Sequence, residues 1–318
     1  MEQLALGLEI GGTKLQAALG SYDGAILQRE RGEVAAGATP EQTLAWFEEH
    51  VPGLVARAED DGKAVGGIGV GFGGPVESAA GRVLLSHQVE GWKDFPLQKW
   101  CESKFSLPTY IANDANAAGW AEYSCGAGKG TRTFCYMNVG SGIGGALIVD
   151  GKLHDGQGLG AFEIGHTYVA DPTSKIPAKS SRLERLYSGW AIEGRLRSGP
   201  ALEEGTELHR LCEGDKDRIS CALLAQAAGA GDVYARSALD DMVQGLGLAI
   251  ANCITLVHPE RFALGGGVSL MGDVLLEPLR TFVNEHVIEH FRGTCEILPA
   301  ALGEDVVLVG ALLLAPGG

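Results

Sequence analysis

The sequence predicts an α/β protein, and three observations support this class. Short apolar runs that end at glycine turns alternate with segments whose apolar residues recur at helical spacing. The chain has 318 residues, enough for one or two domains with a sizeable core. Its 48 glycines, about twice the average usage, fall in clusters and not in a Gly-X-Y register. Clustered glycine indicates tight turns, or backbone that approaches a ligand closely.

The elements follow one another as three strands and a helix, then strands and helices, twice over. Apolar runs bounded by turn residues predict strands at 4–10, 15–19, 25–28, 67–72, 108–112, 133–139, 145–149 and 261–264. Apolar stripes, often preceded by an N-cap residue, predict helices from 40, at 97–105 and 115–123, from 183, 220 and 232, and at 302–314. The polar segment 171–181, with two prolines, predicts a loop. We place a domain boundary near Ala112.

The start of the first helix has a clear local signal. Thr39 is a favoured N-cap residue, and Pro40 fits the first helical position. The run at 67–72 ends at Gly73-Gly74, and we expect it to be a buried strand. Asn113-Asp114 then stands where a short strand meets an alanine-rich helix.

Charge and cysteine content exclude several classes of function. The chain has 25 basic and 40 acidic residues and a net charge of −15. Such a surface repels nucleic-acid backbones and anionic lipids, so we expect no nucleic-acid partner and no membrane partner. The seven cysteines are scattered, without a C-x-x-C pair, and we see no secretory signal pattern and no apolar run that could span a bilayer. We therefore expect a reduced, cytoplasmic protein.

Two glycine turns between predicted strands are candidate phosphate sites. Gly11 to Lys14 presents consecutive backbone N–H groups, a hydroxyl and a cation, although a plain hairpin turn has the same pattern. Gly140 to Gly145 matches G-x-G-x-x-G by letter, but a strand follows it where a dinucleotide fold needs a helix. A second phosphate hairpin, with Ser141 as an additional donor, remains.

Polar residues beside strand ends are candidate catalytic or sugar-binding groups. Asp114 opens a helix after a strand, a common place for a residue in the crevice of an α/β sheet, although an acidic helix cap looks the same. Glu163 and His166 lie three residues apart and can both bond sugar hydroxyls, although surface positions would also explain them. The pair His286 and His290 matches a zinc signature, but the polar face of an amphipathic helix explains it better.

Taken together, these segments resemble the ROK family of sugar kinases (repressor, open reading frame, kinase), within the actin-like and hexokinase-like ATPase superfamily. The resemblance runs along nearly the whole chain. It includes LGLEIGGTKLQAAL, GVGFGGPVE, GWKDFPL, IANDANAAGWAE, NVGSGIGGALIVDGKLHDG, FEIGH, LERLYSGWAI, the LGGGVS turn and LVGALLLA.

The resemblance implies a two-lobed actin-like ATPase fold, related to ribonuclease H, with an active-site cleft between the lobes. Residues 1–112 and 302–318 would form the N-terminal lobe, and 113–301 the C-terminal lobe with sugar-binding and dimerisation elements. It also implies ATP-dependent phosphorylation of a hexose at the 6-hydroxyl, with glucose as the substrate, Mg²⁺ as cofactor and a homodimeric assembly. The alternatives are a kinase for N-acetylmannosamine or another hexose, a sugar-responsive repressor, and a sugar-binding relative with weak catalysis.

The resemblance further implies a role for individual residues. Asp114 would be the general base. The substrate-binding residues would be Gly74, Asn113, Asp114, Glu163, His166 and Glu184. The nucleotide would be bound by Gly11, Gly12, Thr13, Lys14, Gly140, Ser141, Gly142, Gly265, Gly266 and Gly267.

The sequence departs from the family pattern at two places. The family's cysteine-rich zinc segment corresponds here to residues 167–182, which contain no cysteine, so we expect no zinc site. The first phosphate motif carries Glu9 where the family has Asp. This longer carboxylate would face the Mg²⁺–phosphate region and contact the ion only indirectly, through its bound water.

Overall fold

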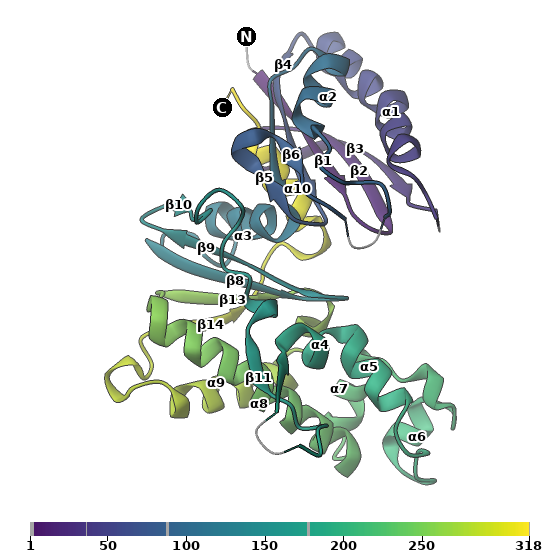
Figure 1. Ribbon diagram of the computed structural model, residues 1–318, viewed down its shortest axis with the longest axis vertical. Coiled ribbons are helices and arrows are strands. Elements are labelled where there is room, and N and C mark those ends of the chain that lie inside the picture. Colours follow the sequence, from purple (N-terminus) through teal and green to yellow (C-terminus); the bar gives the residue numbers. More distant parts are fainter. Residues whose placement is uncertain (1–2, 36, 87–88, 177–178, 318) are drawn as a thin grey trace. The chain divides into compact units, whose positions relative to one another are not determined.

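The protein was analysed as a computed structural model, which describes residues 3–35, 37–86, 89–176 and 179–317 (Figure 1). The chain divides into two compact units. Unit 1 comprises Met1–Gly130, Ala146–Ala161 and Leu302–Gly318, and unit 2 comprises Thr131–Gly145 and Phe162–Ala301. Helices and strands alternate in both units, which confirms the predicted α/β class. The predicted lobe boundary near Ala112 stays a prediction, since the compact units divide the chain at other residues.

The sheet of unit 1 has five strands in the order β3-β2-β1-β4-β7. Their bounds are β1 Gln3–Ile10, β2 Lys14–Gly20, β3 Ile26–Glu33, β4 Ala64–Phe72 and β7 Thr109–Asn113. β1, β2 and β3 are antiparallel neighbours, as predicted, whereas β4 runs parallel to both β1 and β7. The carboxyl ends of β1, β4 and β7 therefore meet at one edge of the sheet, the usual place for a ligand in α/β proteins.

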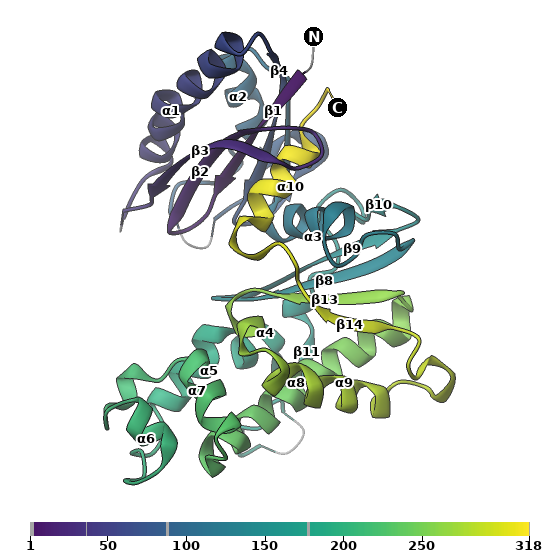
Figure 2. The ribbon, with the colours of Figure 1, turned by 180° about the vertical axis from the view of Figure 1, so that it is seen from behind.

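Helices pack on this sheet, and their bounds are α1 Pro40–Asp60, α2 Leu97–Phe105, α3 Asp114–Cys125 and α10 Val306–Leu314. Side chains of α1 and α2 share one hydrophobic core with β4, whereas α10 contacts β1, β4 and α3 (Figures 1 and 2). The predicted N-cap of α1 is confirmed: Thr39 Oγ1 accepts a bond from Gln42 N, and Gln42 Oε1 accepts one from Thr39 N. This reciprocal capping box satisfies two backbone donors of the first turn.

The two faces of β4 carry different kinds of residue. Ile68, Val70 and Phe72 are buried in the core that contains α1. The alternate positions are glycines that face α10, and a Cβ on Gly69 would lie 1.8 Å from the carbonyl oxygen of Ala311. No side chain fits such a gap, so the helix backbone rests directly on the strand. These glycines serve helix packing within the strand that we predicted at 67–72.

The contact between α10 and α3 is equally close. A Cβ on Gly310 would lie 1.9 Å from the carbonyl oxygen of Ala117. The terminal helix also begins later than predicted, at Val306, because Gly303–Asp305 forms a 3₁₀ turn, η6.

The second sheet has the order β10-β9-β8-β13-β14. Its strands are β8 Thr133–Val139, β9 Ile143–Val149, β10 Lys152–Leu153, β13 Arg261–Gly265 and β14 Glu296–Pro299. β8, β13 and β14 belong to unit 2, and β13 runs parallel to both β8 and β14. The register pairs Gly265 with Asn138, so β13 and β8 end side by side.

The helices of unit 2 surround one long helix, α8. Their bounds are α4 Leu183–Tyr187, α5 Gly189–Arg197, α6 Glu207–Leu211, α7 Cys221–Gly229, α8 Val233–Val257 and α9 Asp273–His286. α8 contacts α4, α7 and α9. Both units also contain small elements. Two short hairpins pair β5 Val76–Glu77 with β6 Arg82–Val83 and β11 Tyr168–Ala170 with β12 Ser180–Arg182. The 3₁₀ turns are η1 Ser78–Ala80, η2 Ile164–His166, η3 Lys216–Arg218, η4 Gly267–Met271 and η5 Glu289–Phe291. Among the residues that the structure describes, no helix has the length and apolar character needed to cross a membrane.

We expect Gly69→Ala to destabilise the protein, because the new methyl group would overlap the backbone of α10. Overpacking of this kind costs about 1–3 kcal/mol in the free energy of unfolding. Gly53→Ala is the matched control: Gly53 lies within α1, and no atom of the described residues is within 4 Å of its missing Cβ. The control should be neutral or stabilise by about 0.5–1 kcal/mol. Equal unfolding curves in urea for the two variants would contradict the close packing of α10.

Candidate functional site

The carboxyl ends of β1, β4 and β7 are joined by hydrogen bonds. Gly73 N, just after β4, donates to the carbonyl oxygen of Ile10 at 2.8 Å. Asn113, the last residue of β7, donates from Nδ2 to the carbonyl oxygen of Gly74 at 3.0 Å. The first glycine turn, the Gly73-Gly74 pair and Asn113-Asp114 therefore lie together in unit 1.

Asn113 and Asp114 divide two tasks between them. Asn113 is the N-cap of α3, and its Oδ1 accepts bonds from Ala115 N at 2.9 Å and Asn116 N at 3.3 Å. Asp114 is the first helical residue, and its Oδ1 accepts from Ala115 N at 2.8 Å. Its Oδ2 faces Gly73, where a Cβ would lie 3.6 Å away. Since Asn113 is the cap, the interpretation of Asp114 as the cap is wrong.

The side chain of Asp114 also lies at the N-terminus of α3. The N-terminus of a helix carries a partial positive charge that stabilises anions near it. A half-buried carboxylate at this position can accept a proton from a ligand while it keeps its backbone bond.

The first glycine turn is a tight hairpin between β1 and β2. Gly11 N donates to the carbonyl oxygen of Lys14 at 2.9 Å, and Val34 N donates to that of Thr13 at 3.0 Å. Gly12 and Thr13 line a cavity of about 640 Å³ together with the first residues of α1. The turn therefore borders a space that can admit a ligand.

Glu9 is buried on β1 beside this turn, with 7% of its surface exposed. Its Oε1 lies 3.0 Å from Nζ of Lys14, and its Oε2 accepts a bond from Gln16 Nε2 at 2.7 Å. Both carboxylate oxygens thus have protein partners. The indirect Mg²⁺ contact of Glu9 stays a prediction, and its ion pair with Lys14 is a feature that the sequence did not reveal.

The second glycine turn, Gly140–Gly142, is held by α4 and α5. Gly140 N donates to the carbonyl oxygen of Gly142 at 2.9 Å and closes the turn. Glu184 Oε2 accepts a bond from Ile143 N at 2.8 Å, just after the turn. Gly189 N donates to the carbonyl oxygen of Gly140 at 2.7 Å, at its start.

Glu163 and His166 belong to a bend that packs on the same strand end. Phe162, just before them, has a positive φ of 60°, a conformation that costs energy for an aromatic residue. Gly165 faces the carbonyl oxygen of Ile143, and a Cβ there would lie only 2.0 Å from that oxygen. The backbone of Ile143 is thus flanked by Glu184 at its N–H and, at its carbonyl group, by the bend with Glu163 and His166, whose side chains are exposed.

The third glycine cluster lies beside β8. Gly266 has a φ of 80°, and a Cβ there would lie 2.4 Å from Oδ1 of Asn138 and 2.5 Å from the carbonyl oxygen of Val139. A Cβ on Gly265 would likewise lie 2.5 Å from the hydroxyl oxygen of Tyr136. All the site residues that we predicted within unit 2 therefore gather around the β8–β9 turn.

Gly73, Gly165 and Gly189 contribute to these arrangements but are missing from the residues predicted from sequence. Gly73 was within reach, since it adjoins Gly74 in a visible cluster. Gly165 and Gly189 are single glycines, and only the folded backbone shows how closely each approaches its neighbour.

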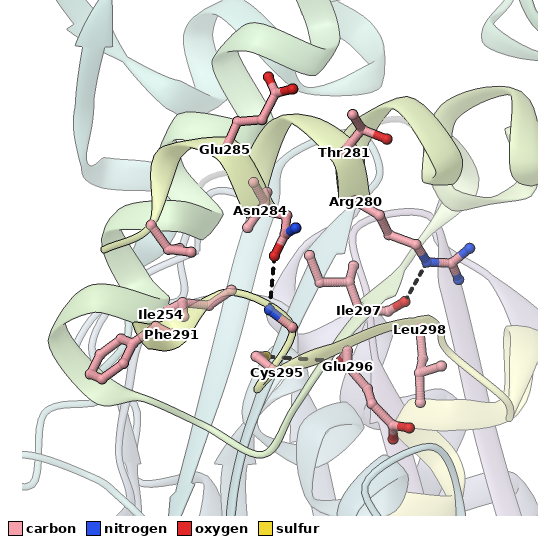
Figure 3. A pocket seen from close by; sticks show the side chains of 13 residues that line it. Ile254, Arg280, Thr281, Asn284, Glu285, Phe291, Cys295, Glu296, Ile297 and Leu298 are labelled. Atoms are coloured by element: carbon pink, nitrogen blue, oxygen red, sulfur yellow. Dashed lines mark hydrogen bonds between the residues drawn. The ribbon is translucent and has the colours of Figure 1, made fainter. Parts of the chain in front are cut away.

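One further cavity, of about 530 Å³, lies between the end of α8, α9 and β14 (Figure 3). None of the predicted site residues lines it. Its wall contains bonds from Arg280 Nε to the carbonyl oxygen of Ile297 and from Gly293 N to Asn284 Oδ1, each 2.8 Å long, and a longer one from Cys295 Sγ to the carbonyl oxygen of Glu296 at 3.9 Å (Figure 3). Burial raises the pKa of the Cys295 thiol in this wall to about 12, so the thiol is not a reactive nucleophile.

Metal-binding groups do not converge in the described part of the chain. Within 3–35, 37–86, 89–176 and 179–317, no three His, Cys, Asp or Glu side chains could together hold an ion. The expected lack of zinc stays a prediction. The expected single helix through His286 and His290 is wrong: α9 ends at His286, because Val287 adopts an extended conformation, and His290 lies in η5.

The comparisons with known proteins agree with these features. The ROK family model matches residues 5–317. The chain is 31% identical over 317 residues to a glucokinase of Streptomyces coelicolor, covering 98% of this chain and 97% of that protein. It is 30% identical over 312 residues to an N-acetylmannosamine kinase of Escherichia coli O139:H28, covering 98% of both chains.

A solved structure shows the same fold. The crystal structure of a ROK family glucokinase from Streptomyces griseus, in complex with glucose and AMPPNP, matches with a TM-score of 0.79 and 31% identity. The match covers 99% of this chain and 100% of that one. The chain belongs to the ROK family, and the actin-like ATPase fold expected from the resemblance is confirmed.

We expect Asn113→Ala to lower the free energy of unfolding, because α3 loses its cap and Gly74 loses its donor. A lost cap costs about 0.5–2 kcal/mol, and a hydrogen bond about 0.5–1.5 kcal/mol. Asn113→Ser should recover the capping part, because its hydroxyl can still accept from the first turn. Chemical unfolding of both variants tests this, and equal losses would show that the cap contributes nothing.

Proposed function

We propose that this protein is an ATP-dependent hexokinase that transfers the γ-phosphoryl group of ATP to the 6-hydroxyl of glucose. The observation that carries the proposal is the Asp114 carboxylate at the start of α3, beside Gly73 and the first glycine turn. The full-length similarity to a glucokinase and to a glucokinase bound to glucose supports glucose as the hexose.

Asp114 is the general base of the proposed reaction. Its carboxylate accepts the proton of the hexose 6-hydroxyl as that oxygen forms a bond to the γ-phosphorus and the bond from phosphorus to the bridging oxygen of ADP breaks. The carboxylate lies at the helix N-terminus, whose partial positive charge stabilises nearby anions. Phosphoryl transfer needs little more from a protein than this base, backbone donors and positioning.

The remaining site residues position the two substrates. In unit 1, Gly11, Gly12, Thr13 and Lys14 bind phosphate, and Gly74 and Asn113 bind the sugar. In unit 2, Gly140, Ser141 and Gly142 bind phosphate, Gly265, Gly266 and Gly267 lie on the adenosine side, and Glu163, His166 and Glu184 bind sugar hydroxyls. The tight turns and the exposed Glu163 and His166 side chains support these roles.

Mg²⁺ enters this proposal with the nucleotide. The ion would neutralise charge on the phosphate oxygens during transfer. Glu9 and Thr13 offer the oxygen ligands that Mg²⁺ prefers, directly or through its bound water. Since Lys14 and Gln16 already engage both oxygens of Glu9, the donor set fits contact through water better than direct ligation.

We further propose a homodimer in the reducing cytoplasm, with a role in glycolysis. All seven cysteines are free thiols, which supports a reducing compartment. Cys253 Sγ donates a hydrogen bond to Cys135 Sγ at 3.6 Å, and the two sulfur atoms form no disulfide.

Two other functions have specific support. The similarity to an N-acetylmannosamine kinase favours a hexose with a larger substituent at C2. The ion pair between Glu9 and Lys14 favours a sugar-binding relative with weak catalysis, because it lowers the positive charge that Lys14 offers to phosphate. ADP release measured with glucose, mannose and N-acetylmannosamine separates these functions: the best substrate shows the largest kcat/KM, and the weak relative releases little ADP with any of them.

Asp114→Asn should lower turnover by about 10²–10⁴-fold, the usual effect of losing a general base. The amide oxygen can still accept from Ala115 N, so the fold and the affinity for the hexose should change little. Coupled ADP release measures turnover, and calorimetry measures hexose affinity. Near-normal turnover of this variant would refute the role of Asp114 as the base.

Glu9→Asp should leave turnover unchanged or raise it. The shorter side chain withdraws the carboxylate from Lys14 and leaves more of that cation for phosphate. Steady-state kinetics over a Mg²⁺ series test this, with Gln16→Ala as the control that removes the other partner of Glu9. A fall of more than about tenfold, equivalent to 1.4 kcal/mol, together with weaker Mg²⁺ affinity, would show that Glu9 is an adapted ligand.

A further inference from the structure

We propose that Glu184 couples hexose binding to nucleotide binding within unit 2, and that Tyr187, Arg195 and Asp241 position it for this purpose. The inference rests on the proposed function, in which Glu184 binds a sugar hydroxyl and Gly140–Gly142 binds phosphate. It adds a regulatory property to that site, namely that each substrate strengthens the binding of the other.

Glu184 is built into the second glycine turn. Its Oε2 accepts the bond from Ile143 N, and a Cβ on Gly142 would lie 2.6 Å from the same oxygen. The start of the turn is held by Gly189 N, only five positions along the chain from Glu184. The junction of α4 and α5 thus forms hydrogen bonds at both ends of the glycine turn. A movement of α4 would therefore change the conformation of this turn.

α4 has only five residues and cannot hold its own orientation. It is anchored to α8 through Asp241, which accepts a bond from the Tyr187 hydroxyl at 3.1 Å and another from Arg195 at 2.6 Å. A second nitrogen of Arg195 donates to the carbonyl oxygen of Leu186 at 3.1 Å, so the guanidinium also bonds the backbone of α4. Three elements, α4, α5 and α8, therefore meet at one carboxylate.

The aromatic ring of Tyr187 also helps to hold α4 against α8. It packs against the backbone of α8 at Gly245, where a Cβ would lie 2.0 Å from the ring, and the guanidinium of Arg195 lies 5.6 Å from the ring centre. Burial and the nearby Asp241 raise the pKa of the Tyr187 hydroxyl well above its ordinary value. The hydroxyl therefore keeps its proton at physiological pH and remains a donor.

These contacts make binding at the two sites interdependent. A hexose hydroxyl that donates to Glu184 restricts the carboxylate, which in turn fixes Ile143 N and the glycine turn. A turn that is already ordered loses less conformational entropy when phosphate binds. By thermodynamic linkage, bound nucleotide must raise hexose affinity by the same factor.

The test compares the glucose affinity of the full chain, by calorimetry, with and without saturating Mg²⁺–AMPPNP. We expect the wild-type protein to bind glucose about fivefold or more tightly with the nucleotide present, the lower end of usual couplings. Tyr187→Phe removes only the hydroxyl, and Asp241→Asn weakens both bonds. Both should reduce the coupling factor towards one and change the affinity for each ligand alone far less.

Tyr234→Phe is the matched control, because it makes the same chemical change at the start of α8, seven positions before Asp241. It should keep the wild-type coupling factor. If Asp241→Asn does not fold, Tyr187→Phe decides the test alone.

Kinase activity of the same samples distinguishes failure of the proposed function from failure of the proposed coupling. Absence of phosphorylation with every hexose tested would refute the proposed function. An active enzyme with no coupling in the wild type, or with unchanged coupling in Tyr187→Phe, would overturn this inference and leave the kinase function intact.

Discussion

The direct contact of α10 with the glycine face of β4 is the constraint on which unit 1 depends. Gly69 and Gly310 have no side chains, so the terminal helix reaches the backbone of both the sheet and α3. This brings the last segment of the chain against strands formed from its first third. It also fixes β4 and α3, whose ends carry Gly73 and Asp114. A methyl group at either glycine would shift the elements that place the proposed base.

In unit 2, polar contacts fix the positions of the elements that carry the candidate site residues. The N–H and the carbonyl group of Ile143 meet Glu184 on one side and Gly165 on the other. The backbone of a single residue therefore sets the spacing between the second glycine turn, α4 and the bend that carries Glu163 and His166. If the Glu184 carboxylate, which accepts the bond from Ile143 N, also binds a sugar hydroxyl as proposed, binding at neighbouring subsites should be linked.

The local parts of this structure could be predicted from the sequence. The strands around the first turn, the start of α1 at Thr39 and the start of α3 at Asp114 follow from turn residues, caps and periodicity, which act over a few positions. The family motifs also named the residues of the candidate site, and their roles stay predictions. The late start of α10 was missed because Gly303–Asp305 forms a 3₁₀ turn that hydropathy does not distinguish from a helix.

Contacts between distant residues could not be predicted in this way. Tyr187 and Asp241 are 54 positions apart, and neither stands in a pattern that points to the other. The sequence predicted β4 as a buried strand, but only the folded chain shows that a helix backbone covers its glycines. The pairing of Glu9 with Lys14 likewise depends on hairpin geometry that the letters do not encode.

The most direct test of the central claim is the structure of the reaction product. ³¹P and ¹³C NMR of a mixture of the protein with ATP, Mg²⁺ and glucose would show which oxygen receives the phosphoryl group. The account predicts glucose 6-phosphate and one equivalent of ADP. Transfer to another hydroxyl, or ADP formation without a sugar phosphate, would contradict it.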